Sequence, residues 1–102
     1  MRVLKPSRIK EYIKKHSAAK TSLEAWLAIA EDANWENLIE VRKQLPSADA
    51  VEVKSKHTVT VFNISGNNYR LIVAIKYEYK MVYVLRFLTH AEYDKEKWKG
   101  EL

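Results

Sequence analysis

Cysteine is absent from this sequence of 102 residues, and glycine and proline occur only twice each. Without cysteine the chain has no disulfide, no thiolate zinc site and no cysteine nucleophile, which suits a reducing cytosol. With so little glycine and proline, we expect neither linkers nor low-complexity segments. A chain of this length is typical of one domain, so residues 1–102 are expected to form a single folded unit.

Long apolar runs are also missing from the sequence. A run such as Leu71 to Ile75 is far short of the ~20 residues that a membrane-spanning helix requires. The first six residues lack the apolar stretch of a secretory signal. We therefore expect a cytoplasmic protein that does not act in a membrane.

Acidic residues are outnumbered, since 18 Lys and Arg stand against 13 Asp and Glu, for a net charge of +5. A basic domain of this size attracts polyanions such as nucleic acid or an acidic partner protein. A solubilising surface is the simpler interpretation of this excess, and charge alone does not decide between the two.

The first half of the chain has the apolar spacing of amphipathic helices. We expect helices over three segments, which are 7–16, 21–30 and 34–45. Their expected N-caps are Ser7, Thr21 and Asn34. The second helix has an alternative start one turn earlier, at Ala18, and Pro46 ends the third.

The second half is rich in Val, Ile, Tyr and Thr, which favour strands. Expected strands are 49–54, 58–64, 69–77 and 81–89, with a further short strand at 1–4. The segment from Ser65 to Asn68 is a hairpin signal because Gly and Asn tolerate positive φ. This order predicts an α+β fold, with N-terminal helices packed on one face of a twisted antiparallel β-sheet.

The odd-numbered positions of the last two strands are apolar. They are Tyr69, Leu71, Val73, Ile75 and Tyr77, then Met81, Tyr83, Leu85 and Phe87. Because side chains alternate between faces, both sets should face the helices if the turn near Glu78 holds an odd number of residues. The open face would then have an apolar floor of Ile72, Ala74, Val82, Val84 and Leu88.

In this register four polar side chains meet on the open face, namely Asn63, Arg70, Arg86 and His90. The hairpin places Asn63 opposite Arg70 if Ser65 pairs with Asn68. Arginine offers a planar fork of donors to phosphate, and histidine transfers protons near neutral pH. Each residue alone is more often a solvated surface group, and only their convergence indicates a phosphodiester site. Tyr93 either joins this cluster or covers the sheet edge.

Other kinds of site have little support in the sequence. The three histidines lack metal-ligand spacing, and no glycine-rich phosphate loop is present, so we expect neither a metal nor a nucleotide cofactor. Lys54 and Lys56 beside a strand either extend the basic face or form an ordinary charged turn.

Two long motifs closely resemble the HigB-type toxins of type II toxin–antitoxin modules. The first runs from Val61 to Leu71 (VFNISGNNYRL) and the second from Thr89 to Asp94 (THAEYD). The opening MRV and the PSAD at 46–49 are also similar, so the resemblance extends over essentially the whole chain. Ser65 stands where the family often has glycine, which affects the hairpin slightly. The family belongs to the RelE/ParE superfamily, whose helices pack on a twisted antiparallel sheet.

The resemblance implies an mRNA endonuclease (mRNA interferase) that inhibits translation by cutting mRNA on the translating ribosome. It also implies a HigA-like helix-turn-helix antitoxin as partner. Arg70, His90 and Tyr93 match the family's motifs and are the implied catalytic residues, with Arg86 next. The arginines would stabilise phosphate charge, while His90 and Tyr93 would transfer protons in an order left open. Such a reaction, in which the RNA 2′-OH attacks phosphorus, needs no metal.

Further residues receive roles that remain open. Lys54, Lys56 and Lys76 are expected to position RNA, and Asn63 either contacts RNA or packs in the hairpin. Asp94 either orients the His90 or Tyr93 side chain or caps the terminal helix.

Two other classes remain possible for this fold. A ParE-like protein would poison DNA gyrase, and a non-catalytic module would only bind an antitoxin or RNA. The His90 and Tyr93 pair in its motif favours the nuclease over both.

Overall fold

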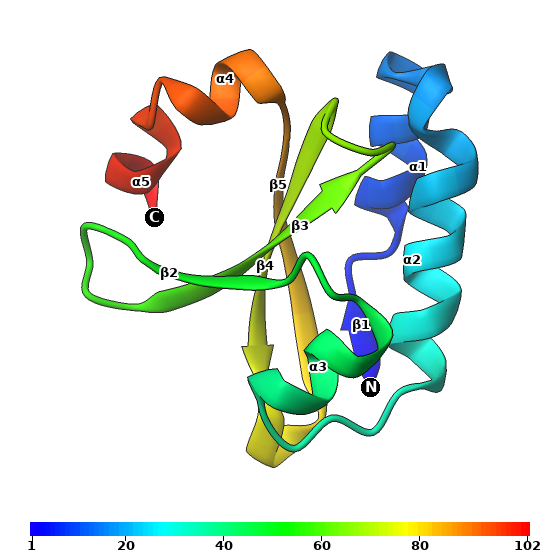
Figure 1. The fold of residues 1–102 in the computed structure, drawn as a ribbon, viewed down its shortest axis with the longest axis vertical. Helices are drawn as coiled ribbons and strands as arrows, with labels where there is room; N and C mark the ends of the chain where they lie inside the picture. Colours follow the sequence, from blue (N-terminus) through cyan, green and yellow to red (C-terminus); the bar gives the residue numbers. More distant parts are fainter.

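The computed structural model describes all residues 1–102 (Figure 1). The elements in chain order are β1 (Arg2–Leu4), α1 (Ser7–Lys15), the 3-10 turn η1 (Ser17–Ala19), α2 (Lys20–Asp32), α3 (Leu38–Gln44), β2 (Asp49–Glu52), β3 (Thr58–Ile64), β4 (Tyr69–Lys76), the 3-10 turn η2 (Tyr77–Tyr79), β5 (Met81–Thr89), α4 (His90–Asp94) and α5 (Lys97–Glu101). Helices α1 and α2 lie on one side of the sheet, and α4 and α5 lie on the other. No helix is both long and apolar enough to cross a membrane.

The five strands form one sheet in the order β1-β5-β4-β3-β2. Strands β2 to β5 pair antiparallel, whereas β1 pairs parallel with β5. The predicted α+β fold is confirmed, but the sheet is mixed and not wholly antiparallel. β1 is the first strand and β5 the last, and the chain between them runs through helices α1 to α3 and strands β2 to β4.

Helix starts differ from their predicted positions because tertiary contacts override local capping signals. Pro6 and not Ser7 is the N-cap of α1. Turn η1 leads directly into α2, so the earlier of the two expected starts is the better one. Helix α3 is capped by Asn37, whose side chain accepts from the Glu40 N–H, and not by Asn34. Trp35 between them is buried and donates to Gln44, which keeps this connection extended.

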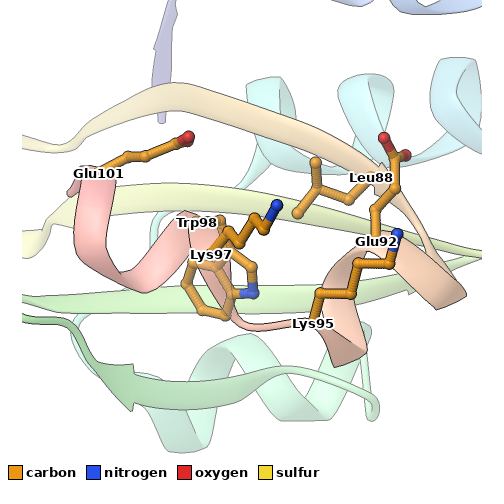
Figure 2. Close-up of a pocket in the computed structure, with 6 residues that line it drawn as sticks. All are labelled: Leu88, Glu92, Lys95, Lys97, Trp98 and Glu101. Carbon is orange, nitrogen blue, oxygen red and sulfur yellow. The ribbon is translucent and has the colours of Figure 1, made fainter.

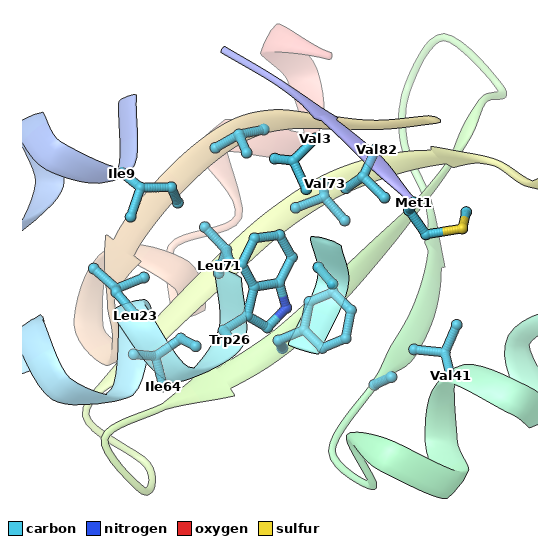
Figure 3. Packing of buried hydrophobic residues seen from close by; sticks show 14 of the residues in the cluster. Met1, Val3, Ile9, Leu23, Trp26, Val41, Ile64, Leu71, Val73 and Val82 are labelled. Atoms are coloured by element: carbon cyan, nitrogen blue, oxygen red, sulfur yellow. The ribbon is translucent and has the colours of Figure 1, made fainter. Parts of the chain in front are cut away.

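The main core lies between the sheet and helices α1, α2 and α3 (Figure 3). Helix α2 contributes Leu23, Trp26 and Ala30, all buried. The sheet contributes Phe62, Ile64, Leu71, Val73, Val82, Val84 and Phe87. Burial of this apolar surface is the main favourable term that holds the helices to the sheet.

A second, smaller core lies on the opposite face of the sheet. Trp98 of α5 is 2% exposed and packs with Val53, Val59, Val61 and Ile72. Tyr93, Leu85, Leu88 and Leu102 pack against this group. The second face is therefore partly covered, and not helix-free as the sequence analysis assumed. Strands with apolar residues on both faces are a signal for such cover.

A β-bulge in β5 changes which side chains face which core. Leu71 pairs with Phe87 and Ile72 with Arg86, but Val73 pairs with Val84, so Leu85 is the extra residue. The turn from Lys76 to Met81 holds four residues, an even number. Consequently the predicted faces are wrong for residues 81–85 and correct for Phe87 and Leu88. Val82 and Val84 enter the main core, and Leu85 joins the second one.

Candidate active site

The candidate site lies where the β3–β4 hairpin meets the end of β5. Asn63 pairs with Arg70 and Phe62 with Leu71, as the hairpin signal predicted. Arg70 also pairs with Leu88 of β5. The His90 N–H donates to the Asn68 carbonyl at 2.9 Å, which docks the first residue of α4 on the hairpin turn. Arg70 and His90, twenty residues apart in sequence, thus become neighbours.

The Arg70 guanidinium is held by the turn beside it. Its Nη1 donates to the carbonyls of Asn67 and Tyr69, both at 3.1 Å. Its Nη2 donates to Asn67 Oδ1 and lies 3.3 Å from His90 Nδ1. Arg70 is only 9% exposed, so the expectation that it projects freely from an open face is wrong. The cover comes from α4, since the guanidinium carbon lies 5.5 Å from the centre of the Tyr93 ring.

The His90 imidazole lies between two oxygen acceptors and one cationic donor. Its Nε2 is 2.9 Å from Asp94 Oδ2, and its Nδ1 is 3.0 Å from the Asn67 carbonyl oxygen. A carboxylate accepts only, so Asp94 fixes a proton on Nε2. With the Nε2–H tautomer, Nδ1 accepts from Arg70; with both nitrogens protonated, Nδ1 donates to Asn67. The side chain is 42% exposed, so solvent and substrate reach it.

The Tyr93 ring stacks on Trp98, with ring centres 5.2 Å apart and an angle of 19° between the planes. Trp98 is held in turn by a hydrogen bond from its Nε1 to the Tyr93 carbonyl. Partial burial of the Tyr93 phenol raises its pKa above the ordinary value, and nearby Lys99 and Arg70 only partly oppose this. A raised pKa keeps the phenol protonated at neutral pH, where it can donate a proton.

A capping box fixes the start of α4. The Thr89 hydroxyl accepts from the Glu92 N–H, and the Glu92 carboxylate accepts from the Thr89 N–H. The hydrogen bond from the Thr89 backbone lowers the pKa of Glu92. This box sets the direction in which His90, Tyr93 and Asp94 leave the strand.

Arg86 belongs to a different neighbourhood. It lies two residues before Leu88 on β5, and its Nε is 3.4 Å from Glu101 of α5. No hydrogen bond or ion pair joins it to Arg70, His90 or Tyr93. A pocket of about 280 Å³ opens nearby between α4 and α5, with Lys95 and Lys97 at its rim (Figure 2). Leu88 and Trp98 also line this pocket, whereas Arg70, His90 and Tyr93 do not.

The predicted RNA-binding residues are spread along the sheet. The Asn63 side chain is exposed, and its backbone N–H donates to Ser47 Oγ at 3.1 Å. Lys54 and Lys56 lie in the β2–β3 turn, roughly 17 Å from Asn63 along β3 at ~3.4 Å per residue. Lys76 lies at the far end of β4, roughly 20 Å from Arg70 by the same rule. The lysines therefore do not join the Arg70–His90 cluster.

Two further residues contribute to this cluster. Asn67, which the sequence marks only as a turn residue, contacts Arg70 and His90 through its two oxygens. Of the two roles considered for Asp94, orienting His90 is the one found. A turn asparagine within the same motif as a candidate arginine was the available signal for the first. No group of three or more His, Asp or Glu side chains is arranged to hold a metal ion.

Most of the chain also matches a known protein family. A family described as HigB_toxin, RelE-like toxic component of a toxin-antitoxin system, matches residues 19–96. The chain belongs to the HigB toxin family. The predicted family is therefore confirmed, and membership in a toxin–antitoxin family implies an antitoxin partner for this toxin.

Curated relatives of the toxin are similar over nearly their whole length. The mRNA interferase toxin HigB of Escherichia coli (strain K12) is 27% identical over 94 residues, which are 92% of this chain and 88% of that protein. The mRNA interferase HigB of Shigella flexneri shows the same values. The mRNA interferase HigB of Escherichia coli O6:H1 is 25% identical over 95 residues, 93% of this chain and 90% of that protein. Their names agree with the predicted enzyme class, an endoribonuclease.

Proposed function

We propose that this toxin is an mRNA endoribonuclease that cleaves translated mRNA on the ribosome and so inhibits translation. The observation that supports this most is the meeting of Arg70, His90 and Tyr93 at one place from two separate motifs. A cation, an imidazole and a protonated phenol can supply the charge stabilisation and the two proton transfers that phosphodiester cleavage by an internal nucleophile requires.

In the proposed reaction the RNA 2′-oxygen attacks the adjacent phosphorus while the bond from phosphorus to the 5′-oxygen breaks. Asp94 holds the proton on His90 Nε2, so Nδ1 takes the proton from the 2′-OH. For this step Nδ1 exchanges its hydrogen bond from Arg70 Nη2 for one from the 2′-OH. The Tyr93 phenol, which is protonated at neutral pH, gives its proton to the departing 5′-oxygen. The products are a 2′,3′-cyclic phosphate and a free 5′-hydroxyl, and no metal takes part in these steps.

Arg70 stabilises the negative charge that develops on the phosphate in this reaction. Its Nη atoms are engaged within the protein, and its Nε has no partner there. Arg86, which is farther away and paired with Glu101, has the secondary role of attracting the RNA backbone. Asn63, beside Arg70 on β3, contacts a phosphate or a base.

RNA approaches along the second face of the sheet in this proposal. Lys54, Lys56 and Lys76 lie too far from His90 to act in chemistry, so their role is to bind neighbouring phosphates. A substrate on translating ribosomes places the reaction in the cytoplasm. The antitoxin is a HigA-like helix-turn-helix protein that carries acidic groups complementary to this basic toxin.

The test is single-turnover cleavage of mRNA on programmed ribosomes, with cut sites mapped by primer extension. We expect the His90→Ala and Tyr93→Phe variants each to cleave about 10²- to 10⁴-fold more slowly than the parent, the usual loss for one general acid or base. Matched controls are His57→Ala and Tyr79→Phe, both exposed and remote from the cluster, which should cleave at the parental rate. Circular dichroism checks that every variant is folded.

Two outcomes would contradict the proposal. Cleavage at the parental rate by a folded His90→Ala, Tyr93→Phe double variant would exclude both residues from proton transfer. Gyrase-linked DNA breaks without RNA cuts would indicate a gyrase poison instead.

A further inference from the structure

We propose that Asn67 is a positioning residue that holds the Arg70 guanidinium against His90, an inference that rests on the proposed function. Asn67 lies in the β3–β4 turn and is not one of the groups given a catalytic role above. It contacts Arg70 through both of its oxygens, the backbone carbonyl on Nη1 and the side-chain Oδ1 on Nη2. A guanidinium only donates, so the side-chain oxygen and not the amide nitrogen must face it.

The geometry of these hydrogen bonds determines where the donors of Arg70 point. With Nη1 also bound to the Tyr69 carbonyl, three oxygens fix the plane of the guanidinium. This plane brings Nη2 to 3.3 Å from His90 Nδ1 and places the guanidinium under the Tyr93 ring. Removal of the Asn67 side chain would leave Nη2 with His90 Nδ1 as its one partner and Nη1 with the carbonyls of Asn67 and Tyr69.

The Asn67 carbonyl also contacts the His90 imidazole. It lies 3.0 Å from His90 Nδ1, so it accepts a hydrogen bond once that nitrogen has taken a proton. Arg70 Nη2 donates to the same nitrogen before that event. Arg70 and Asn67 together therefore partner His90 Nδ1 in both of its protonation states, which keeps the ring in one place during the reaction.

The turn that carries Asn67 is itself anchored at other points. Ser65 and Gly66 both have positive φ, 53° and 67°, as a tight hairpin turn requires. Ser65 Oγ donates to Ser22 Oγ of α2 at 3.2 Å, and the Asn68 carbonyl receives the His90 N–H. Asn67 is outside the positive-φ region, so alanine fits its backbone conformation. An Asn67→Ala variant should therefore lose the side-chain contact and keep the fold.

The experiment compares Asn67→Ala with Asn67→Asp, which keeps an oxygen in the same position. One readout is the NMR spectrum of the Arg70 side chain in the whole protein. A held guanidinium rotates slowly and gives separate signals for its Nη protons, whereas a free one gives an averaged signal. We expect separate signals in the parent and in Asn67→Asp, and an averaged signal in Asn67→Ala.

The other readout is the split between kcat and KM for cleavage on programmed ribosomes. We expect Asn67→Ala to lower kcat roughly 10- to 100-fold, since a misplaced group costs this much, with KM changed less than about twofold. Asn34→Ala, an exposed asparagine without side-chain hydrogen bonds, is the matched control and should change neither value.

Parental Arg70 signals in Asn67→Ala would overturn the inference, as would a parental kcat when those signals have averaged. A fall in kcat or a rise in KM without any change in the Arg70 signals would also overturn it. If the parent protein cleaves no RNA, the proposed function fails by itself, while the NMR comparison still decides whether Asn67 holds Arg70.

Discussion

At the scale of single residues, Arg70 connects the parts of the candidate site. It contacts Asn67, Tyr69 and His90 through hydrogen bonds and Tyr93 through its ring. A planar fork can reach all of these partners at once, whereas the point charge of a lysine cannot. The residue therefore has a structural task as well as the proposed catalytic one.

We expect Arg70→Ala and Arg70→Lys to lose cleavage on the order of 10²-fold or more, because neither keeps the guanidinium whose Nε is left for the phosphate. Arg70→Ala should also lower the free energy of unfolding by about 1 kcal/mol, since two partly buried carbonyls lose their donor. Urea unfolding measures the stability, and single-turnover assays measure the rate. Arg2→Ala, at an exposed arginine whose side chain makes no hydrogen bond or ion pair, is the control. An Arg70→Lys variant of parental activity would refute the need for the fork.

At the scale of secondary-structure elements, the bulge in β5 and the start of α4 determine which side chains lie at the candidate site. The bulge reverses the faces of residues 81–85, so one strand serves both cores. The capping box then ends β5 and starts a helix at His90. Both are local features with consequences far along the chain.

The position of the bulge predicts that substitutions at Val84 and Tyr83 lower the free energy of unfolding by different amounts. Val84 is 1% exposed and Tyr83 is 36% exposed. We expect Val84→Asn to cost about 2–3 kcal/mol of unfolding free energy, because it buries an unpaired amide. Tyr83→Asn should cost less than about 1 kcal/mol at its exposed site. Urea unfolding of both variants checks this, and the reverse order would mean that β5 runs without the bulge.

The capping box predicts a pH dependence of stability. The folded state lowers the pKa of Glu92, so ionised Glu92 stabilises the fold at neutral pH. This contribution is fully present above the ordinary pKa of a glutamate and disappears as the pH falls through the lowered value. Thr89→Ala should cost about 1 kcal/mol at pH 7.

The pH test uses Glu92→Gln, which cannot ionise. Its deficit in unfolding free energy relative to the parent should be largest at pH 7 and should close in acid. It should remain small because Glu92 is well exposed. Urea titrations at pH 7 and pH 3 measure the difference, with the exposed Glu24→Gln as control. A deficit that grows in acid would contradict the role of the box.

At the scale of the whole molecule, the net charge of +5 acts over the length of the sheet. The three lysines expected to bind RNA lie at two places well away from His90. Phosphate contacts at such distances change affinity and its salt dependence, and not the chemical step. In the proposed function, the Arg70–His90 cluster therefore carries out the reaction and the distant lysines bind RNA.

We expect the affinity for a single-stranded RNA with 2′-O-methyl groups, which lacks the nucleophile, to fall steeply with salt. Each of Lys54→Ala, Lys56→Ala and Lys76→Ala should reduce the slope of log affinity against log salt by about 1. Their kcat should stay at the parental value. Fluorescence anisotropy measures the binding, with Lys10→Ala on the opposite face as control. Unchanged slopes would remove these lysines from the RNA path.

Much of the site was predictable from sequence because local pairing rules determine it. The Gly66 turn sets the register that places Asn63 opposite Arg70, and the THAEYD motif keeps His90, Tyr93 and Asp94 within one short helix. The helix N-caps were less predictable. Asn37 and not Asn34 caps α3 because Trp35 is drawn into the core, which is a tertiary effect.

By itself, the sequence determined the α+β class, the strands 58–64 and 81–89, and the pairing of Asn63 with Arg70. These follow from side-chain periodicity and from motifs, which act over a few neighbouring residues. Only the tertiary structure decided the bulge at Leu85, the cover of the second face by Trp98, and the burial of Arg70 under Tyr93. Each depends on contacts between segments far apart in the chain, where packing free energy outweighs local preference.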